Sequence, residues 1–267
     1  MSQIIQSNKL INGVNLNTPR LPDPPKYAPI GEPPEFLAVV CVWWGDLYGI
    51  DYVEKLYNSV KRNLSIPHHF YCITEHENVP DGVQRIEAPN NSKGWWQKVN
   101  LFRKDLFPDK WHSLNQSLRY SDYRRQWFQC QYDRVIYLDL DVVITGSIDE
   151  IASSSGEFVM IENFGPNKKH AAHNSSIVLW NPSTLSQNIS DAFDAEVTRE
   201  LHGDQCWIWR VMDSHITNFR KDLVDSYKYS KRSEWKRSKG EVSPVMIFHG
   251  NPKPHQSNDT WVKKNWC

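Results

Sequence analysis

Short, wholly apolar runs alternate with amphipathic segments along this chain, and that alternation limits its fold more than any other feature. The run from Phe36 to Trp43 is apolar throughout and partly β-branched, which is typical of a strand covered on both faces. Residues 51–63 follow with apolar side chains at helical spacing. Strands alternating with helices predict an α/β fold with a mostly parallel sheet, and such sheets bind ligands at the carboxyl ends of their strands.

The remaining predicted elements continue this order towards the end of the chain. A polar, aromatic segment at 110–133 has weak periodicity, and we expect an insertion of undefined shape there. We predict strands at 69–74, 83–88, 135–138, 158–161, 177–180 and 245–248, and helices at 95–106, 189–201 and 204–212.

Proline marks a different kind of segment at the N-terminus. Seven of the 16 prolines lie between Pro19 and Pro34, where apolar periodicity is almost absent. This composition predicts an extended, proline-rich arm over residues 1–33. A single folded domain is then expected over residues 34–267, because the apolar share of 39% is enough to bury a sizeable core.

The charge balance excludes several classes of partner. Lys+Arg and Asp+Glu each number 31, so the basic excess that nucleic acids and anionic membranes require is missing. No apolar run approaches the length of a transmembrane segment, and the first residues lack the pattern of a secretion signal. Five scattered cysteines suit a reducing compartment. We therefore expect a soluble, cytoplasmic protein without a nucleic-acid partner.

Two carboxylates, Asp139 and Asp141, stand at the end of the apolar run 135–138 and before another apolar run. In a strand, residues i and i+2 face the same side, so both carboxylates can reach one ion. Desolvating two like charges is costly unless a cation joins them. The pair therefore predicts a divalent-metal site; the plainer alternative is a strand that ends in polar residues.

A phosphatase is one alternative that this pair allows. Residues 139–143 fit the D-x-D-x-[TV] motif of haloacid-dehalogenase-like phosphatases, whose first aspartate is a nucleophile. These enzymes also carry a later G-D-x-x-x-D motif. Here Gly203 and Asp204 are followed at the expected place by Ile208. A non-catalytic carbohydrate-binding protein is a second alternative, favoured by the 12 tryptophans, although it does not explain a buried acidic pair.

A family resemblance rests on five segments that follow one another along the chain. They are 44–49 (WGDLYG), 94–98 (GWWQK), 137–148 (YLDLDVVITGSI), 174–181 (NSSIVLWN) with 203–205 (GDQ), and 248–254 (FHGNPKP). In this order they resemble the nucleotide-sugar glycosyltransferases of the GT-A fold, in particular the family-8-like bacterial and viral branch, over roughly residues 36–255. The resemblance implies a single Rossmann-like mixed sheet flanked by helices.

The same resemblance implies a hexosyltransferase. The donor would be a nucleoside diphosphate sugar, expected to be a UDP-sugar, and the acceptor a carbohydrate, lipid or protein. Asp139, Asp141 and His249 would hold Mn²⁺ or Mg²⁺, and an imidazole ligand favours Mn²⁺. A lone histidine at a strand end can also be a structural hydrogen-bonding residue. In similar enzymes two residues separate this histidine from the next glycine, whereas here Gly250 directly follows His249.

Further residues are assigned by the resemblance to the donor and to catalysis. Asp204 and Gln205 correspond to the catalytic motif that binds the donor sugar and lies near its anomeric carbon, and retention of configuration would follow. Asp204 can also be read as a helix N-cap, and Tyr48 and Lys98 as core and surface residues. The expected donor-binding residues are Asp46, Tyr48, Lys98, Asn174, Ser175, Gly250 and Lys253.

Overall fold

The computed structural model describes residues 25–90, 92–103, 105–107, 132–165, 172–194, 196–230 and 242–267. Most of the insertion expected at 110–133 and most of the arm expected at 1–33 lie outside the described residues. Among those that are described, no helix combines the length and the apolar character that crossing a membrane requires.

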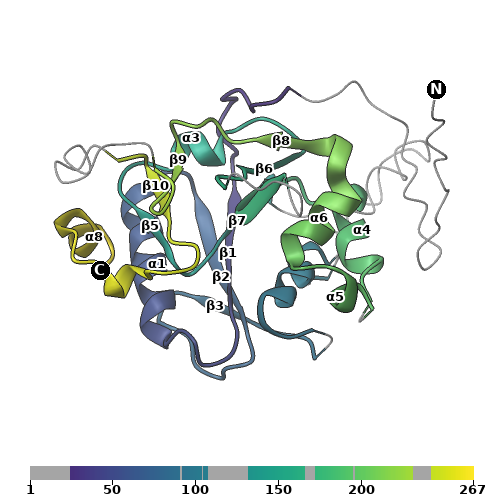
Figure 1. The fold of residues 1–267 in the computed structure, drawn as a ribbon, viewed down its shortest axis with the longest axis horizontal. Helices are drawn as coiled ribbons and strands as arrows, with labels where there is room; N and C mark the ends of the chain where they lie inside the picture. Colours follow the sequence, from purple (N-terminus) through teal and green to yellow (C-terminus); the bar gives the residue numbers. More distant parts are fainter. Residues whose placement is uncertain are drawn as a thin grey trace, which may run out of the picture.

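A mixed sheet of seven strands forms the centre of the described part, in the order β3-β2-β1-β4-β7-β6-β8 (Figure 1). Strand β1 pairs in parallel with β2 and β4, whereas β7 runs antiparallel to both β4 and β6. The predicted α/β class is therefore confirmed. The strands are β1 (Leu37–Trp43), β2 (His68–Thr74), β3 (Gln84–Glu87), β4 (Arg134–Leu138), β6 (Phe158–Glu162), β7 (His173–Trp180) and β8 (Ile216–Asn218).

Strand β1 shows why the sheet is covered on both faces. Leu37, Val39 and Cys41 point into one core with helix α1 (Ile50–Asn63). Ala38 and Val40 point into the opposite core, because successive side chains of a strand alternate between faces. That second core holds the 3₁₀ helix η1 (Gly94–Phe102), α4 (Thr184–Asp191) and α6 (Asp204–Met212).

A second sheet of three strands joins the end of the chain to the acidic segment. Its order is β5-β10-β9, formed by β5 (Val142–Ile144), β10 (Val245–Ile247) and β9 (Val224–Ser226). The register sets Ile247 opposite Val142, so the residues after β10 lie beside Asp141. Short elements complete the described part: α3 (Asp149–Ala152), α5 (Val197–Glu200), η3 (Asp213–His215), η4 (Pro254–Gln256) and α8 (Thr260–Asn265).

Two of the predicted helices are wrong in extent. Instead of one helix at 189–201, α4 ends at Asp191 and α5 begins at Val197. The Asp194 side chain accepts hydrogen bonds from the amides of Glu196 and Val197 at 2.9 and 3.3 Å, a local cap that starts a new helix. The helix predicted at 95–106 is a 3₁₀ helix that ends at Phe102.

The described part of the expected arm lies against the domain. Ala28 is buried, and its amide donates to the Asn218 carbonyl at 2.7 Å. The Gly31 amide donates to the Ser153 carbonyl at 2.8 Å. Residues 26–28 therefore continue the hydrogen bonding of the sheet edge at β8, whereas residues 30–31 pair with the segment after α3.

Candidate active site

Three elements, β4, β7 and α6, meet where β4 ends and β7 begins. Asp139 directly follows β4, and its amide donates to the Ser176 carbonyl of β7 at 2.9 Å. Because β7 is antiparallel to β4, its first residues, Asn174 and Ser175, lie at this same edge. The first residue of α6, Asp204, accepts a hydrogen bond from the Ser175 hydroxyl at 2.6 Å. The strand register and the start of α6 thus bring three predicted site residues together.

Lys98 of η1 links these acidic side chains. Its Nζ lies 2.8 Å from Asp139 Oδ1 and 3.7 Å from Asp204 Oδ2, and it donates to Ser175 Oγ at 3.4 Å. The side chain is only 11% exposed. Burial alone would lower the pKa of Lys98, but the charges of Asp139 and Asp204 outweigh it and raise that pKa well above its ordinary value. Lys98 is therefore a buried cation held by two carboxylates.

For Asp204, in contrast to Lys98, the effect of burial on the pKa outweighs that of its partners. Burial raises the pKa of its carboxyl, and Lys98 and the Ser175 hydroxyl act against that rise. Asn174, which precedes Ser175 and is also a predicted donor-binding residue, accepts a hydrogen bond from the Ser176 amide at 2.9 Å. The side chain of Gln205, in the first turn of α6, is half-buried and forms no hydrogen bond with another described residue. Its amide is thus available to a ligand next to Asp204.

Asp141 has its own pair of partners. Its Oδ2 accepts a hydrogen bond from the Tyr48 hydroxyl at 2.9 Å and an ion pair from Lys253 Nζ at 2.6 Å. Burial and the nearby Asp139 raise the pKa of this carboxyl, whereas Lys253 and Tyr48 lower it. Burial and Asp141 in turn raise the pKa of the Tyr48 phenol. Tyr48 and Lys253 therefore reach the acidic pair from opposite ends of the chain.

The carboxylate oxygens are unevenly used. The hydrogen bonds and ion pairs that described residues make to the acidic pair go to Asp139 Oδ1 and Asp141 Oδ2. Those to Asp139 include one from the Tyr137 hydroxyl. Asp139 Oδ2 and Asp141 Oδ1 receive none from described residues. Two carboxylate oxygens thus stay available to a ligand.

His249, which the resemblance assigns to a metal, is hydrogen-bonded to Ser226 in this structure. Its Nε2 is 2.8 Å from the Ser226 hydroxyl, and its ring lies parallel to Phe164 at 5.8 Å and against Tyr229 at 5.4 Å. Burial, with Lys228 and Lys253, lowers the pKa of His249, which favours the neutral imidazole. In the described part of the chain, no three histidine, cysteine or acidic side chains are grouped as a metal site.

The two remaining predicted residues lie on exposed turns. Gly250 has φ +74°, a left-handed conformation that glycine adopts without strain, and no atom lies within 4 Å of where a β-carbon would stand. Asp46 is exposed and has no hydrogen bond or ion pair with another described residue. Among the described residues, no hydrogen bond or ion pair joins either of them to the cluster formed by the other predicted residues.

Sequence reasoning missed the residues that fix the loop carrying Asp46 and Tyr48. The Gly45 amide donates to Glu75 Oε1 at 2.9 Å, and the Gly45 carbonyl lies 3.2 Å from His76 Nε2. The His76 ring stacks on Trp43 at 4.0 Å, and the Trp43 indole donates to the Tyr48 carbonyl at 2.7 Å. Glu75 and His76 follow β2, which pairs in parallel with β1. The residues after these two strands lie at the same edge of the sheet, and this could have indicated the contact from sequence.

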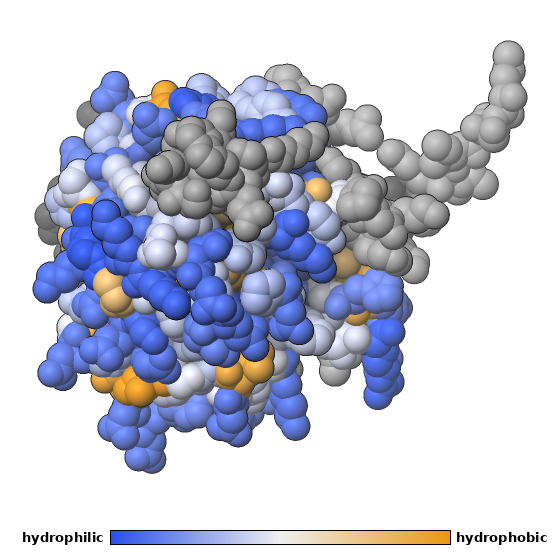
Figure 2. All heavy atoms as spheres, turned by 60° about the vertical axis from the view of Figure 1, so that its left-hand side comes forward, coloured by the Kyte–Doolittle hydropathy of each residue, from blue (hydrophilic) through white to orange (hydrophobic). Residues whose placement is uncertain are grey.

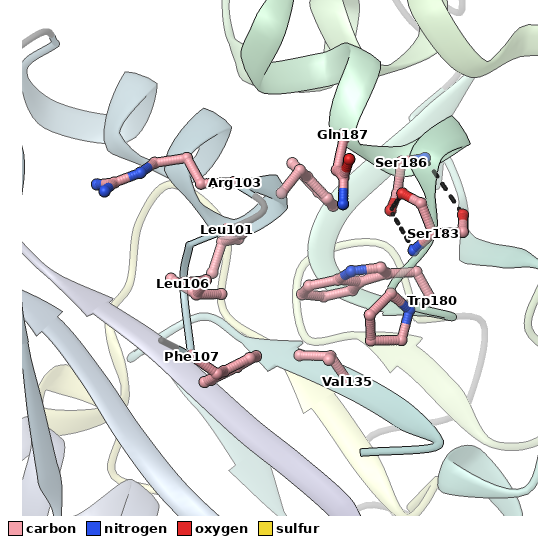
Figure 3. Close-up of a pocket in the computed structure, with 11 residues that line it drawn as sticks. Leu101, Arg103, Leu106, Phe107, Val135, Trp180, Ser183, Ser186 and Gln187 are labelled. Atoms are coloured by element: carbon pink, nitrogen blue, oxygen red, sulfur yellow. Dashed lines mark hydrogen bonds between the residues drawn. The ribbon is translucent and has the colours of Figure 1, made fainter. Parts of the chain in front are cut away.

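A small cavity lies beside Val135, at the start of β4 (Figure 3), whereas the acidic pair follows the end of that strand. It is lined by Val135, Trp180, Leu106 and residues of α4, and Arg103 points away from it. The space open to water inside it is about 20 Å³, enough for one water molecule rather than a sugar. This cavity is therefore separate from the candidate site.

The chain was compared with known proteins at three levels. No protein-family model matches it, and no curated protein matches its sequence. Its structure is similar to that of the glycosyltransferase GlyE of Streptococcus pneumoniae TIGR4, with a TM-score of 0.53, 14% identity, and coverage of 83% of this chain and 57% of GlyE. The chain thus spans little more than half of GlyE.

A second solved structure aligns over most of both chains. The galactosyltransferase LgtC, solved with donor and acceptor sugar analogues, gives a TM-score of 0.48 at 11% identity, covering 86% of this chain and 93% of LgtC. At 14% identity, the similarity to GlyE shows the fold and nothing beyond the fold. The GT-A fold class expected from the sequence is confirmed.

Proposed function

We propose that this protein is a glycosyltransferase that moves a hexose from a nucleoside diphosphate sugar, most simply a UDP-sugar, to a hydroxyl acceptor. The observation that carries the proposal is the buried cluster of Asp139, Asp141 and Asp204 with Lys98 and Lys253. It lies at the edge of the sheet where α/β proteins bind nucleotides. The GT-A fold adds support from an independent direction.

The charge of the cluster favours a divalent cation. Three carboxylates and two ammonium groups leave one net negative charge, and a donor pyrophosphate would add about two more. An added Mn²⁺ or Mg²⁺ would offset this excess, and the oxygens Asp139 Oδ2 and Asp141 Oδ1 suit such an ion. The residues therefore fit a metal held by Asp139 and Asp141, with His249 as a third ligand through Nδ1, or through Nε2 if it leaves Ser226.

The bound cation would supply charge stabilisation to the departing diphosphate. Lys253 would move from Asp141 to the phosphates, and the Gly250 turn would let the backbone approach them. Tyr48 and Asp46 would contact the base from the loop after β1. All of these residues would bind the nucleoside diphosphate part of the donor.

At the sugar half, Asp204 would accept hydrogen bonds from sugar hydroxyls, with Asn174 and Ser175 beside it. Lys98 keeps the Asp204 charge compensated. In the transfer, the acceptor oxygen forms a bond to the anomeric carbon as the carbon–phosphate oxygen bond breaks. The leaving phosphate takes the acceptor proton, with Gln205 alongside, and the configuration is retained.

The two alternatives explain less of the geometry. A phosphatase of the haloacid-dehalogenase type would need a later acidic residue, but Ile208 occupies that place and is fully buried in the core. A carbohydrate-binding protein would not need a buried acidic pair with two lysines. Neither alternative is favoured.

A donor screen tests the proposal. Purified protein is incubated with UDP-, GDP- and ADP-sugars, and the released nucleoside diphosphate is measured with Mn²⁺, with Mg²⁺ and with EDTA. We expect release from a UDP-sugar that EDTA abolishes and excess Mn²⁺ restores. Release that is insensitive to EDTA would contradict the metal assignment, and no release from any donor would contradict the transferase assignment.

A further inference from the structure

Large apolar side chains are seldom exposed on the described surface. Figure 2 shows a face that is largely hydrophilic with small, separate hydrophobic spots. Trp95 is 60% exposed, while the adjacent Trp96 is 8% exposed. A single exposed apolar residue needs no explanation by itself, so the meaning of Trp95 depends on what it borders.

Trp95 borders the acidic cluster. A β-carbon placed on Gly203 would lie 3.6 Å from the indole Nε1 and 3.8 Å from its Cδ1, so this edge of the ring lies beside Gly203. Gly203 directly precedes Asp204, and half-buried Gln205 comes next. On its own element, Trp95 precedes Lys98 by three residues, which is one 3₁₀ turn, and Lys98 pairs with Asp139 and Asp204.

The turn that carries Trp95 is fixed from both sides. Gly94 has φ +58°, a left-handed conformation that favours glycine and turns the chain into η1. Trp96 packs into the core against Phe193 at 5.6 Å. Gln97 is fully buried and donates to the carbonyls of Pro89 and Ser92 at 2.9 and 2.5 Å. The indole is thus an exposed aromatic surface on a rigid support.

We propose that Trp95 is the platform for the acceptor and that this acceptor is a saccharide. The inference rests on the proposed glycosyltransferase function and names its second substrate class. A pyranose ring has an apolar C–H face and a polar rim, which matches an indole bordered by Asp204 and Gln205. A sugar stacked there would present a hydroxyl towards the donor sugar held at Asp204.

The surroundings favour a saccharide over the other acceptor classes. A lipid chain is bound by a contiguous apolar surface, whereas Trp95 is bordered by the glycine turn and polar side chains of α6. A peptide acceptor would be recognised over an extended groove with backbone partners, and η1 contributes a single ring. Both classes become outcomes of the test.

The experiment compares Trp95→Ala, Trp95→Phe and a matched tryptophan control, Trp209→Ala. Trp209 lies on α6, is half-buried, and donates to Asp213 at 2.8 Å, outside the cluster. Release of UDP from the UDP-sugar selected by the donor screen is measured without acceptor. It is then measured with methyl glucoside, lactose and maltose as saccharide probes, with a serine peptide, and with a medium-chain alcohol in detergent micelles.

We expect a saccharide to stimulate release by the wild type. Trp95→Ala should raise the KM for that saccharide about tenfold, the size of one lost stacking contact, and leave acceptor-free hydrolysis and the KM for the donor unchanged. Trp95→Phe should recover most of the loss, and Trp209→Ala should show none of it.

Three results would overturn the inference. They are an unchanged saccharide KM in Trp95→Ala, an equal loss of acceptor-free hydrolysis, and stimulation by the peptide or the micellar alcohol in place of every saccharide. In each of these cases the wild type still releases UDP, so the proposed transferase function stands. Absence of any UDP release by the wild type would remove both proposals together.

Discussion

Lys98 and Asp204 are the side chains on which the buried cluster depends. Both are almost withdrawn from solvent; they pair with each other at 3.7 Å and share Ser175 as a partner, and Lys98 also pairs with Asp139. Removing one member of a buried ion pair leaves the other charge uncompensated, a loss of several kcal/mol in typical proteins. The cluster therefore behaves as one unit, in which the effect of each residue on the free energy of unfolding depends on the other residues.

The pKa shift of Asp204 predicts how stability depends on pH. Its carboxyl pKa is raised, so above the ordinary aspartate value of about 4 the folded state holds a proton more tightly than the unfolded state. Stability from this group is therefore present at low pH and is lost as pH rises through the raised pKa. Asp204→Asn should remove this loss.

Urea unfolding of the wild type and Asp204→Asn between pH 4.5 and 7 measures the effect. The variant's stability relative to the wild type should rise with pH, while Asp222→Asn, which changes an exposed partner of Arg220, should show no such trend. A relative stability that falls with rising pH would contradict the raised pKa.

For single residues, the sequence predicted the members of the site better than the hydrogen-bond partners that hold them. The structure brings together seven residues that were predicted from the sequence: Asp139, Asp141, Lys98, Ser175, Asp204, Tyr48 and Lys253. The bond from Tyr137 to Asp139 was missed, although both lie on one side of β4 by their i, i+2 spacing. The partner of His249, Ser226, lies 23 residues away, and no local pattern could have indicated it.

Among the elements, η1 has the greatest effect on the site. The sequence predicted a helix there from apolar spacing, which cannot separate a 3₁₀ helix from an α-helix over so few residues. The structure shows that Gln97 fixes η1 to the preceding loop and that Asn100 donates to Gln97 Oε1 at 2.8 Å. Lys98 therefore stands on a support built from buried amide hydrogen bonds.

Gln97→Leu tests this support. The change keeps a similar volume but leaves the carbonyls of Pro89 and Ser92 without their donor, which should cost about 1–3 kcal/mol. We also expect weaker donor binding, since Lys98 loses its fixed position. Denaturant unfolding and the donor KM measure the two effects, with Lys93→Ala, on the exposed turn before η1, as the control. Unchanged stability would show that the two bonds are unimportant.

Over the whole molecule, the site joins the first strand of the sheet to the last strand of the chain. The strands β5, β9 and β10 each have three residues, too short to show periodicity, and their pairing spans about a hundred residues of sequence. Sequence patterns predicted β10 but could not reveal this small sheet. After it, α8 returns to α1, where the hydroxyl of Ser59 donates to the Asn265 carbonyl at 3.0 Å.

Trp261 of α8 connects this C-terminal packing to the site. It is 4% exposed, and its ring lies 6.4 Å from that of Phe248, which precedes His249. Trp261→Ala should lower the free energy of unfolding by about 3 kcal/mol and raise the donor KM, because the segment carrying Lys253 loses its backing. Trp261→Phe should cost less, since the buried indole nitrogen has no hydrogen-bond partner among the described residues.

Thermal unfolding and donor kinetics on both variants, with Lys264→Ala on the exposed side of α8 as control, give the answer. A donor KM that stays at the wild-type value in a clearly destabilised Trp261→Ala protein would show that C-terminal packing does not position Lys253.

In the proposed mechanism, Asp141 binds, together with Asp139, a divalent cation that holds the donor diphosphate. The most direct measurement is calorimetric titration of UDP into the wild type and Asp141→Asn, each with and without Mn²⁺. We predict Mn²⁺-dependent binding to the wild type and none to the variant, with both proteins folded by circular dichroism. Equal UDP affinity in the two proteins, in the presence of Mn²⁺, would contradict the account.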